Sequence, residues 1–342
     1  MVSKVKSMDK KILLAHGSGG TLSQRLIEAH FLPSLLNPIL ELLDDGAILD
    51  FDGLRLCMST DTYVVDPIFF PGGDIGKLAV CGTINDLCMC GGKPLYLSIA
   101  VIIEEGFSMA DLDRIITSMA DTAKAAGVHV VTGDTKVVPN GKGDKIFINS
   151  TGIGHVLYSG HISGTNARTG DIIILSGTIG DHGMAVMSQR EGLRFSGEIM
   201  SDVAHLNEMV RDILDVSANI HCMRDPTRGG IASVLNEIAD KSKKRFLIDE
   251  ETIPVRPQVR GACEILGIDP MYVANEGKML AIVAPEDAKK VLDTIRSHPL
   301  GKEAAIIGKV CEDSDGEVIL NTLIGGKRIL DRPTGEILPR IC

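Results

Sequence analysis

The chain of 342 residues is long enough for two domains, and its 44% hydrophobic residues can form sizeable cores. Its formal net charge of −10 argues against general nucleic-acid binding, which needs clustered Lys and Arg to neutralise phosphates. No apolar stretch approaches the roughly 20 residues of a membrane helix, and the apolar run at 12–15 is too short for a signal peptide. We therefore expect a cytoplasmic protein with neither nucleic acid nor membrane as a partner, and the eight scattered cysteines suit a reducing compartment.

The first half of the chain alternates between helical and extended patterns. Residues 11–15 indicate an extended segment, and Thr21 can cap a helix to about Leu43 that Pro33 and Pro38 break. An Asp52-Gly53 pair predicts a hairpin turn between two strands. The predicted strands are 48–51, 54–59, 95–103, 128–132 and 145–155, and the further helices are 74–90 and 108–126.

Polar and glycine residues dominate 158–170, where we place a domain boundary. The second half repeats the same kinds of element, so two α+β halves follow. Its predicted strands are 171–176, 246–248, 278–283 and 304–310, and its helices start near 183, 201, 229, 259 and 285. We expect an N-terminal segment (1–45), a first domain (46–160), a second domain (161–330) and an extended or mobile tail (331–342), since the tail has two prolines and a glycine without periodicity.

Three aspartates in the first half end an apolar strand or stand beside a turn: Asp61, Asp86 and Asp134. Carboxylates at strand ends can converge on one magnesium ion, which prefers oxygen ligands and bridges phosphates. Lys136 can meet a phosphate as a point charge. For any one aspartate alone, an Asx-turn or a helix cap is the more common explanation. Three such positions in one half, together with a glycine-rich segment, favour a metal–phosphate site.

A glycine-rich segment, consisting of His16, Gly17, Ser18, Gly19 and Gly20, precedes the first predicted helix. Free backbone N–H groups at a helix start can hold phosphate, although a flexible helix entry has the same pattern. In the second half, residues 180–183 (Gly-Asp-His-Gly) and 224–230 (Arg-Asp-Pro-Thr-Arg-Gly-Gly) contain more Asp, His and Arg than turns need. Glu276 is either a base or a loop carboxylate.

Cys342 is a thiol on the last residue of the tail, where it is open to oxidation unless it is used. Twelve extended residues reach up to roughly 40 Å, so the thiol can travel. An incidental terminal cysteine is the alternative.

Six motifs occur together: Thr60-Asp61-Thr62, Asn85-Asp86-Leu87, Gly133-Asp134-Thr135-Lys136-Val137-Val138, Gly180-Asp181-His182-Gly183, Asp225-Pro226-Thr227-Arg228-Gly229-Gly230 and Pro339-Arg340-Ile341-Cys342. In combination they resemble the HypE family of hydrogenase maturation factors. That family belongs to the ATP-using superfamily of aminoimidazole ribonucleotide synthetase, selenophosphate synthetase and thiamine-monophosphate kinase. The resemblance covers residues 16–342. The aspartate motifs indicate the superfamily, and the Pro-Arg-Ile-Cys ending separates HypE from its relatives.

The resemblance implies an α+β, two-domain PurM-like fold, with a C-terminal α/β sandwich and a homodimer whose N-terminal strands form a shared barrel. ATP and Mg²⁺ are then expected in a cleft near the dimer interface, covered by residues 17–20. Asp61, Asp86 and Asp134 are the expected magnesium ligands, and Lys136 lies near the phosphates. The further nucleotide positions are Thr135, Asp225, Thr227, Arg228 and Gly229. The implied partners are HypF, which loads a carbamoyl group onto Cys342, and the HypC–HypD complex, which accepts cyanide.

The expected reaction dehydrates a thiocarbamate to a thiocyanate. Transfer of the ATP γ-phosphoryl group to the carbamoyl oxygen makes that oxygen a leaving group, and a base must deprotonate the nitrogen. Glu276 is the first candidate for the base and His16 the second. One alternative is a small-molecule synthetase of the selenophosphate or aminoimidazole ribonucleotide type. Selenophosphate synthetases carry a reactive Cys or Sec and a Lys in the glycine loop, which residues 16–20 lack. A non-catalytic adaptor that presents its tail is the other alternative.

Overall fold

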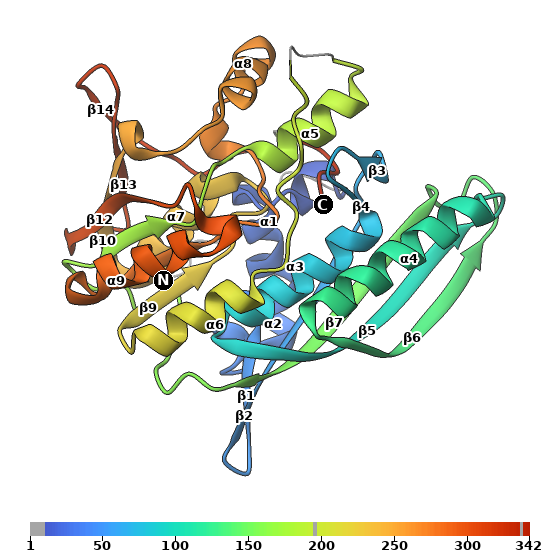
Figure 1. The fold of residues 1–342 in the computed structure, drawn as a ribbon, viewed down its shortest axis with the longest axis horizontal. Coiled ribbons are helices and arrows are strands. Elements are labelled where there is room, and N and C mark those ends of the chain that lie inside the picture. Colours follow the sequence, from blue (N-terminus) through green and yellow to red (C-terminus); the bar gives the residue numbers. More distant parts are fainter. Residues whose placement is uncertain (1–10, 194–196, 336–337) are drawn as a thin grey trace.

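Two mixed sheets, one in each half of the chain, organise the molecule (Figure 1). The computed structural model describes residues 11–193, 197–335 and 338–342. The first sheet has the order β1-β2-β7-β5-β6, in which only β5 and β6 run parallel. Its strands are β1 (Ala47–Phe51), β2 (Leu54–Tyr63), β5 (Gly92–Glu104), β6 (His129–Val138) and β7 (Ile146–Val156), and a small hairpin consists of β3 (Phe69–Phe70) and β4 (Gly73–Asp74).

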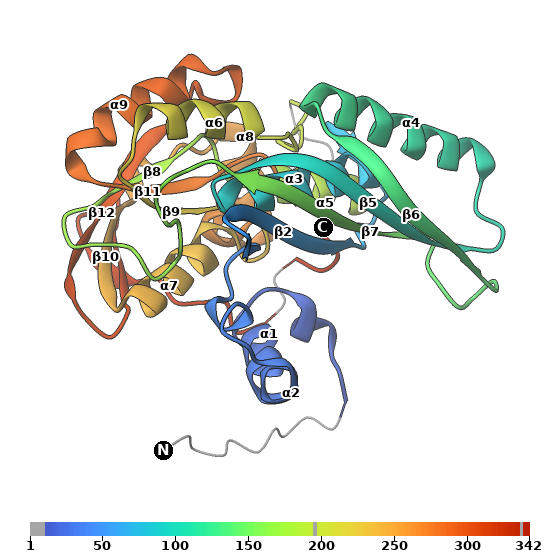
Figure 2. The same ribbon diagram turned by 90° about the horizontal axis from the view of Figure 1, so that it is seen from below.

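Local sequence signals set most boundaries in this half. Asp52 and Gly53 have φ angles of 53° and 84°, as the tight turn between β1 and β2 requires. The helices α3 (Ile75–Met89) and α4 (Met109–Ala126) begin after the side-chain caps Asp74 and Ser108. Both helices lie against one face of the sheet (Figure 2). The hairpin and both helices are confirmed.

The strand predicted at 128–132 is wrong in extent. β6 runs on to Val138 and forms the edge of the sheet, and nearly all of its residues are exposed. The side chains of Val131 and Val137 are 59% and 66% exposed. Proteins normally cover an edge strand of this length when it exposes several apolar side chains and one unpaired side of its main chain.

The second sheet has the order β14-β13-β10-β12-β8-β11-β9. Helices α6 and α9 cover one of its faces, and α7 packs on the other; α5 and α8 lie beside each other at one end (Figures 1 and 2). Its strands are β8 (Ile172–Leu175), β9 (Ile220–Arg224), β10 (Lys244–Asp249), β11 (Leu280–Val283), β12 (Ala305–Asp313), β13 (Val318–Asn321) and β14 (Lys327–Ile329). The helices are α5 (Asp181–Arg190), α6 (Asn207–Val216), α7 (Gly230–Ser242), α8 (Pro257–Leu266) and α9 (Pro285–Ser297), with short 3₁₀ turns at Glu250–Thr252, Pro270–Tyr272 and Pro299–Gly301.

A continuous hydrophobic core joins the two halves. Buried residues of α3, such as Leu78 and Ile84, belong to the same cluster as Met209 and Val210 of α6. Asn85 of α3 also donates a hydrogen bond to the main-chain oxygen of Ala204 (3.0 Å). Side chains of the first half are therefore held at fixed positions relative to side chains of the second half. No helix within the described residues is both long and apolar enough to cross a membrane.

The helix predicted from Thr21 to Leu43, broken by its prolines, is confirmed as far as Leu35 and wrong beyond it. It lies beneath the two halves in Figure 2 and has three consecutive pieces: α1 (Thr21–Leu26), a π-helical turn at Ile27–Phe31 and α2 (Leu32–Leu35). A 3₁₀ turn at Leu14–Gly17 precedes it, and another follows at Leu40–Leu42. The extended segment expected at 11–15 is likewise replaced in part by the first turn. Helical geometry ends at Leu35, just before Asn37-Pro38, because the residue before a proline avoids helical geometry.

Candidate functional site

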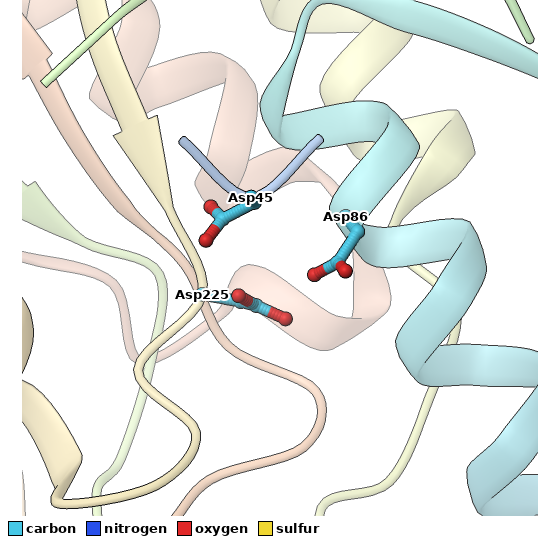
Figure 3. A group of neighbouring side chains, drawn as sticks. All are labelled: Asp45, Asp86 and Asp225. Carbon is cyan, nitrogen blue, oxygen red and sulfur yellow. The ribbon is translucent and has the colours of Figure 1, made fainter. Parts of the chain in front are cut away.

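Three aspartates from distant parts of the chain meet between the halves (Figure 3). Asp45 precedes β1, Asp86 lies in the last turn of α3, and Asp225 directly follows β9. One carboxylate oxygen from each lies within 4.8 Å of the others. Such a set of oxygen atoms is what a hard divalent cation prefers.

The electrostatics of this cluster are unfavourable without a cation. Burial raises the pKa of Asp45 and of Asp86 well above the ordinary value, and their negative neighbours raise it further. Burial also raises the pKa of Asp225 to about 7, although Arg224 acts in the opposite direction. Arg224 forms an ion pair with Oδ1 of Asp45 at 2.8 Å, while Oδ2 of Asp45 is buried and has no hydrogen-bond partner among the described residues. The donor set therefore fits a divalent metal ion.

The predicted trio of Asp61, Asp86 and Asp134 does not come together within one chain. Asp61 lies near enough to the cluster for its charge to raise the pKa of both Asp86 and Asp225. Asp134 lies on β6, three strands from β2 across the sheet, a distance of about 14 Å at the usual strand spacing. There it is exposed and forms an ion pair with Lys136 at 2.8 Å. Asp45 was not singled out from the sequence. The pattern that could have indicated it is the acidic pair Asp44-Asp45, which stands next to a glycine before the first strand.

The tail is docked inward, which the sequence alone left open. Its main chain runs antiparallel to residues 64–66: the N–H of Val64 donates to the oxygen of Cys342 (3.0 Å), and the N–H of Asp66 donates to the oxygen of Arg340 (3.2 Å). Ile341 is buried, and Cys342 is half-buried.

The Cys342 thiol faces a mixed electrostatic environment. Burial raises its pKa to about 12, Arg228 lowers it, and Glu276, Asp61 and Asp225 raise it. These charges come from both halves of the chain. The thiol thus lies within the field of the same acidic groups that surround the candidate metal site.

Glu276 is a buried residue whose negative charge acts on this thiol. Burial raises its pKa well above the ordinary value, with contributions from Asp225, Asp202 and Asp61, while Arg228 lowers it. Its N–H donates to Oδ1 of Asp202 (3.1 Å), and its main-chain oxygen accepts from Asn85 (3.2 Å). Within the described residues, Oε1 of Glu276 has no hydrogen-bond partner. A rigidly held carboxylate with a raised pKa and a free oxygen is well suited to accept a proton.

The glycine-rich segment lines a cleft together with the docked tail and the start of α7. Gly17, Ser18, Arg228, Gly229 and Cys342 are among the residues that line it. Gly19 packs so closely on Arg228 that an added Cβ would lie 2.7 Å from that residue's own Cβ. Thr227 closes the turn between β9 and α7, since its main-chain oxygen accepts from the N–H of Gly230 (3.0 Å). His16 instead hydrogen-bonds locally, accepting from the N–H of Leu13 at Nδ1 (2.9 Å).

The fold and the acidic cleft define a class of protein. Residues 43–156 match the family model described as AIR synthase related protein, N-terminal domain, and residues 168–321 match the corresponding C-terminal domain. A thiamine-monophosphate kinase from Aquifex aeolicus shares the fold, with a TM-score of 0.64 at 18% identity over 90% of this chain and 97% of that chain. The chain is thus an AIR synthase-related protein with the expected two-domain PurM-like α+β fold.

Within this class the chain belongs to the HypE family. It is 52% identical over 333 residues to carbamoyl dehydratase HypE of Cupriavidus necator, covering 97% of this chain and 95% of that protein. It is 47% identical over 336 residues to carbamoyl dehydratase HypE of Escherichia coli K12, covering 97% and 99%. Crystal structures of a HypE–HypF complex (TM-score 0.86, 50% identity, 90% and 99% covered) and of HypE in complex with ATP (0.82, 50%, 97% and 100%) have the same fold. The resemblance found in the motifs is confirmed.

Proposed function

We propose that this protein is an ATP-dependent carbamoyl dehydratase of nickel–iron hydrogenase maturation, acting on an S-carbamoyl group carried by its own Cys342. Membership of the HypE family supports the activity. The single observation that carries the residue assignment is the docked tail, which places Cys342 in the cleft with Arg228 and within the electrostatic reach of Glu276. A small-molecule synthetase reaction has no use for a cysteine held in this position.

The acidic cluster fits magnesium, and we assign the cleft lined by Gly17, Ser18, Arg228 and Gly229 to ATP. Asp45, Asp86 and Asp225 would hold the metal ion, with Asp61 beside them, and this set replaces the trio expected from the sequence. Residues 17–20, Thr227, Arg228 and Gly229 would surround the phosphates, and the HypE structure with bound ATP supports nucleotide binding. When bound, the magnesium ion neutralises phosphate charge and thereby eases phosphoryl transfer to the carbamoyl oxygen.

The protein's own part in the reaction is to position the carbamoyl group and to accept protons. Dehydration of R–S–C(=O)–NH₂ breaks the carbon–oxygen bond, with the oxygen leaving as part of phosphate. Both protons leave the nitrogen, one to a protein base and one to the departing phosphate, to give R–S–C≡N. Glu276 lies close enough to influence the thiol and offers an unpartnered oxygen as the base. His16 is engaged with Leu13, so the geometry favours Glu276. Arg228 supplies a positive charge next to the sulfur and its substituent.

The exposed edge of the first sheet supports a homodimer. Val130, Val131 and Val137 of β6 are largely exposed, and a shared barrel with a second copy would cover them. We propose that Asp134, Thr135 and Lys136 then serve the nucleotide site of the partner subunit, since they are about 14 Å from Asp61 in their own chain. The HypE–HypF structure supports HypF as a partner, and we propose that HypF is the carbamoyl donor and HypC–HypD the cyanide acceptor.

Intact-mass analysis tests the proposal. Protein carbamoylated at Cys342 by HypF is incubated with Mg²⁺ and ATP, and its mass is measured before and after. We expect the terminal peptide to lose one water in the parent. The Glu276→Gln variant, which is nearly isosteric, should be loaded but keep its carbamoyl group, while Cys342→Ser should not be loaded. Dehydration at an unchanged rate in Glu276→Gln would rule out its role as base, and a carbamoyl group on another residue would contradict the assignment to Cys342.

A further inference from the structure

Helix α5 begins with the motif at residues 180–183, which the proposed chemistry leaves unused. The residues of α5 contact the docked tail at four consecutive positions, 338–341. We propose that α5 is the docking platform of the tail, and that His182 and Arg190 are positioning residues that hold Cys342 in the cleft. This inference rests on the proposed function, because it concerns how that reaction is prepared.

His182 is fully buried and binds the main chain of the tail. Its Nε2 lies 2.9 Å from the oxygen of Ile341, and its Nδ1 lies 2.8 Å from Oγ of Ser201. The main-chain oxygen of Ile341 can only accept, so Nε2 carries the ring proton and donates it. In the neutral ring Nδ1 is then the acceptor and takes the hydroxyl proton of Ser201, whose Oγ also accepts from the N–H of Val203 (3.1 Å). Burial lowers the pKa of His182, in keeping with a neutral ring in this tautomer.

Arg190, at the other end of α5, joins the tail to the strand-end segment that the tail runs along. Its Nη1 donates to the oxygen of Pro339 (2.6 Å) and its Nη2 to the oxygen of Arg340 (2.8 Å). Its Nε donates to the oxygen of Asp66 (2.7 Å). A planar guanidinium can make these bonds at once, whereas a lysine ammonium offers a single point of attachment.

Gly183 provides room for the tail at the start of α5. A Cβ at this position would lie 2.5 Å from Cγ1 of Val273 and 3.1 Å from Cδ1 of Leu338. Leu338 and Met187 pack against the same small hydrophobic cluster. The glycine, the histidine and the arginine of one helix thus contact successive residues of the tail.

The hydrogen bonds reach main-chain carbonyls of residues 339–341 and leave the Cys342 side chain untouched. These hydrogen bonds therefore form in the same way whether the sulfur carries hydrogen, a carbamoyl group or cyanide. The platform can hold the tail during dehydration and release it without chemical change. Fixing the reacting group in this way supplies the orientation that phosphoryl transfer to the carbamoyl oxygen requires.

Two readouts test the platform. The rate at which iodoacetamide alkylates Cys342, followed by peptide mass, reports how long the tail is undocked, and the rate of ATP-dependent dehydration reports positioning. The variants are Arg190→Met, His182→Leu and His182→Gln, with Arg211→Met as the matched control on an exposed arginine of α6. In Arg190→Met and His182→Leu we expect alkylation to rise about tenfold and dehydration to fall about tenfold, with the KM for ATP unchanged. His182→Gln should recover most of both, because its amide N–H can reach the same carbonyl, and the control should behave as the parent.

Parent-like alkylation and dehydration in both Arg190→Met and His182→Leu would overturn the platform. A second result would also overturn it: His182→Gln and His182→Leu lose dehydration to the same extent while Cys342 is alkylated at the parent rate. The imidazole ring would then have a role other than holding the tail. A parent that never dehydrates its carbamoyl group would contradict the proposed function instead, while the alkylation rates would still decide the docking role of α5.

Discussion

The acidic cluster makes a quantitative prediction about Asp225. This carboxyl is buried beside Asp45 and Asp86, and its ionised form is opposed by burial and by negative neighbours. Asp225→Asn keeps the shape of the side chain and replaces the charge with an amide whose N–H groups can donate to the neighbouring carboxylates. We therefore expect the metal-free variant to be more stable than the parent at neutral and alkaline pH.

The size of the effect follows from the pKa. Below pH 3.8 the carboxyl is protonated in both the folded and the unfolded chain, so it contributes no penalty. Because its pKa in the folded protein is about 7 rather than 3.8, folding becomes less favourable as pH rises between these values. Each pKa unit corresponds to about 1.4 kcal/mol, so the full penalty above pH 7 is about 4 kcal/mol. Asp225→Asn should recover up to that amount at pH 8 and almost none at pH 4.

Urea unfolding in EDTA at pH 4, 6 and 8 measures this difference between variant and parent. Repeating the titration at pH 8 with Mg²⁺ adds a second comparison: the parent should gain stability by binding the ion, and the variant should gain less, since it lacks one ligand. A variant that is less stable than the parent at pH 8 without metal would refute the electrostatic reasoning. A stability gain that does not shrink toward pH 4 would refute it as well.

Three further predictions concern the tail and its surroundings. Gly183→Ala should destabilise the protein by about 1–3 kcal/mol in thermal unfolding, because the added methyl group would lie 2.5 Å from Val273. It should also speed alkylation of Cys342, because the same methyl group crowds Leu338 of the tail at 3.1 Å; an unchanged alkylation rate would contradict this. The rate of Cys342 alkylation in the folded parent should keep rising about tenfold per pH unit from pH 8 to 11, because the pKa of the thiol is about 12. In urea-unfolded protein the rate should level off near pH 9. A plateau near pH 9 in the folded protein would instead place the thiol in solvent. Gly230→Ala should lower the free energy of unfolding by at least about 2 kcal/mol. Gly230 has a φ of 61°, and an added Cβ would lie within 2.8 Å of three main-chain atoms of residues 271–273. Unfolding at the parent's midpoint would show that the turn can relax.

The sequence alone was sufficient for much of the local structure and for the family. Asp52-Gly53 predicted the first hairpin, and Ser108 predicted the start of α4, because turn and cap preferences depend on a few adjacent residues. The motifs from Thr60 to Cys342 indicated the HypE family, which the comparisons confirm. The domain limits at 46–160 and 161–330 stay predictions.

The tertiary structure decided which of the candidate groups meet. Asp45 joins Asp86 and Asp225 only because α3 packs between the two halves, and no local pattern reports such a long-range contact. Asp134 follows a predicted strand, as Asp61 does, yet its strand lies at the far edge of the sheet, and strand order does not follow from periodicity. The inward tail likewise depends on the distant side chains of α5, which donate to main-chain carbonyls. Every residue type carries such carbonyls, so the sequence of the tail holds no sign of where it docks.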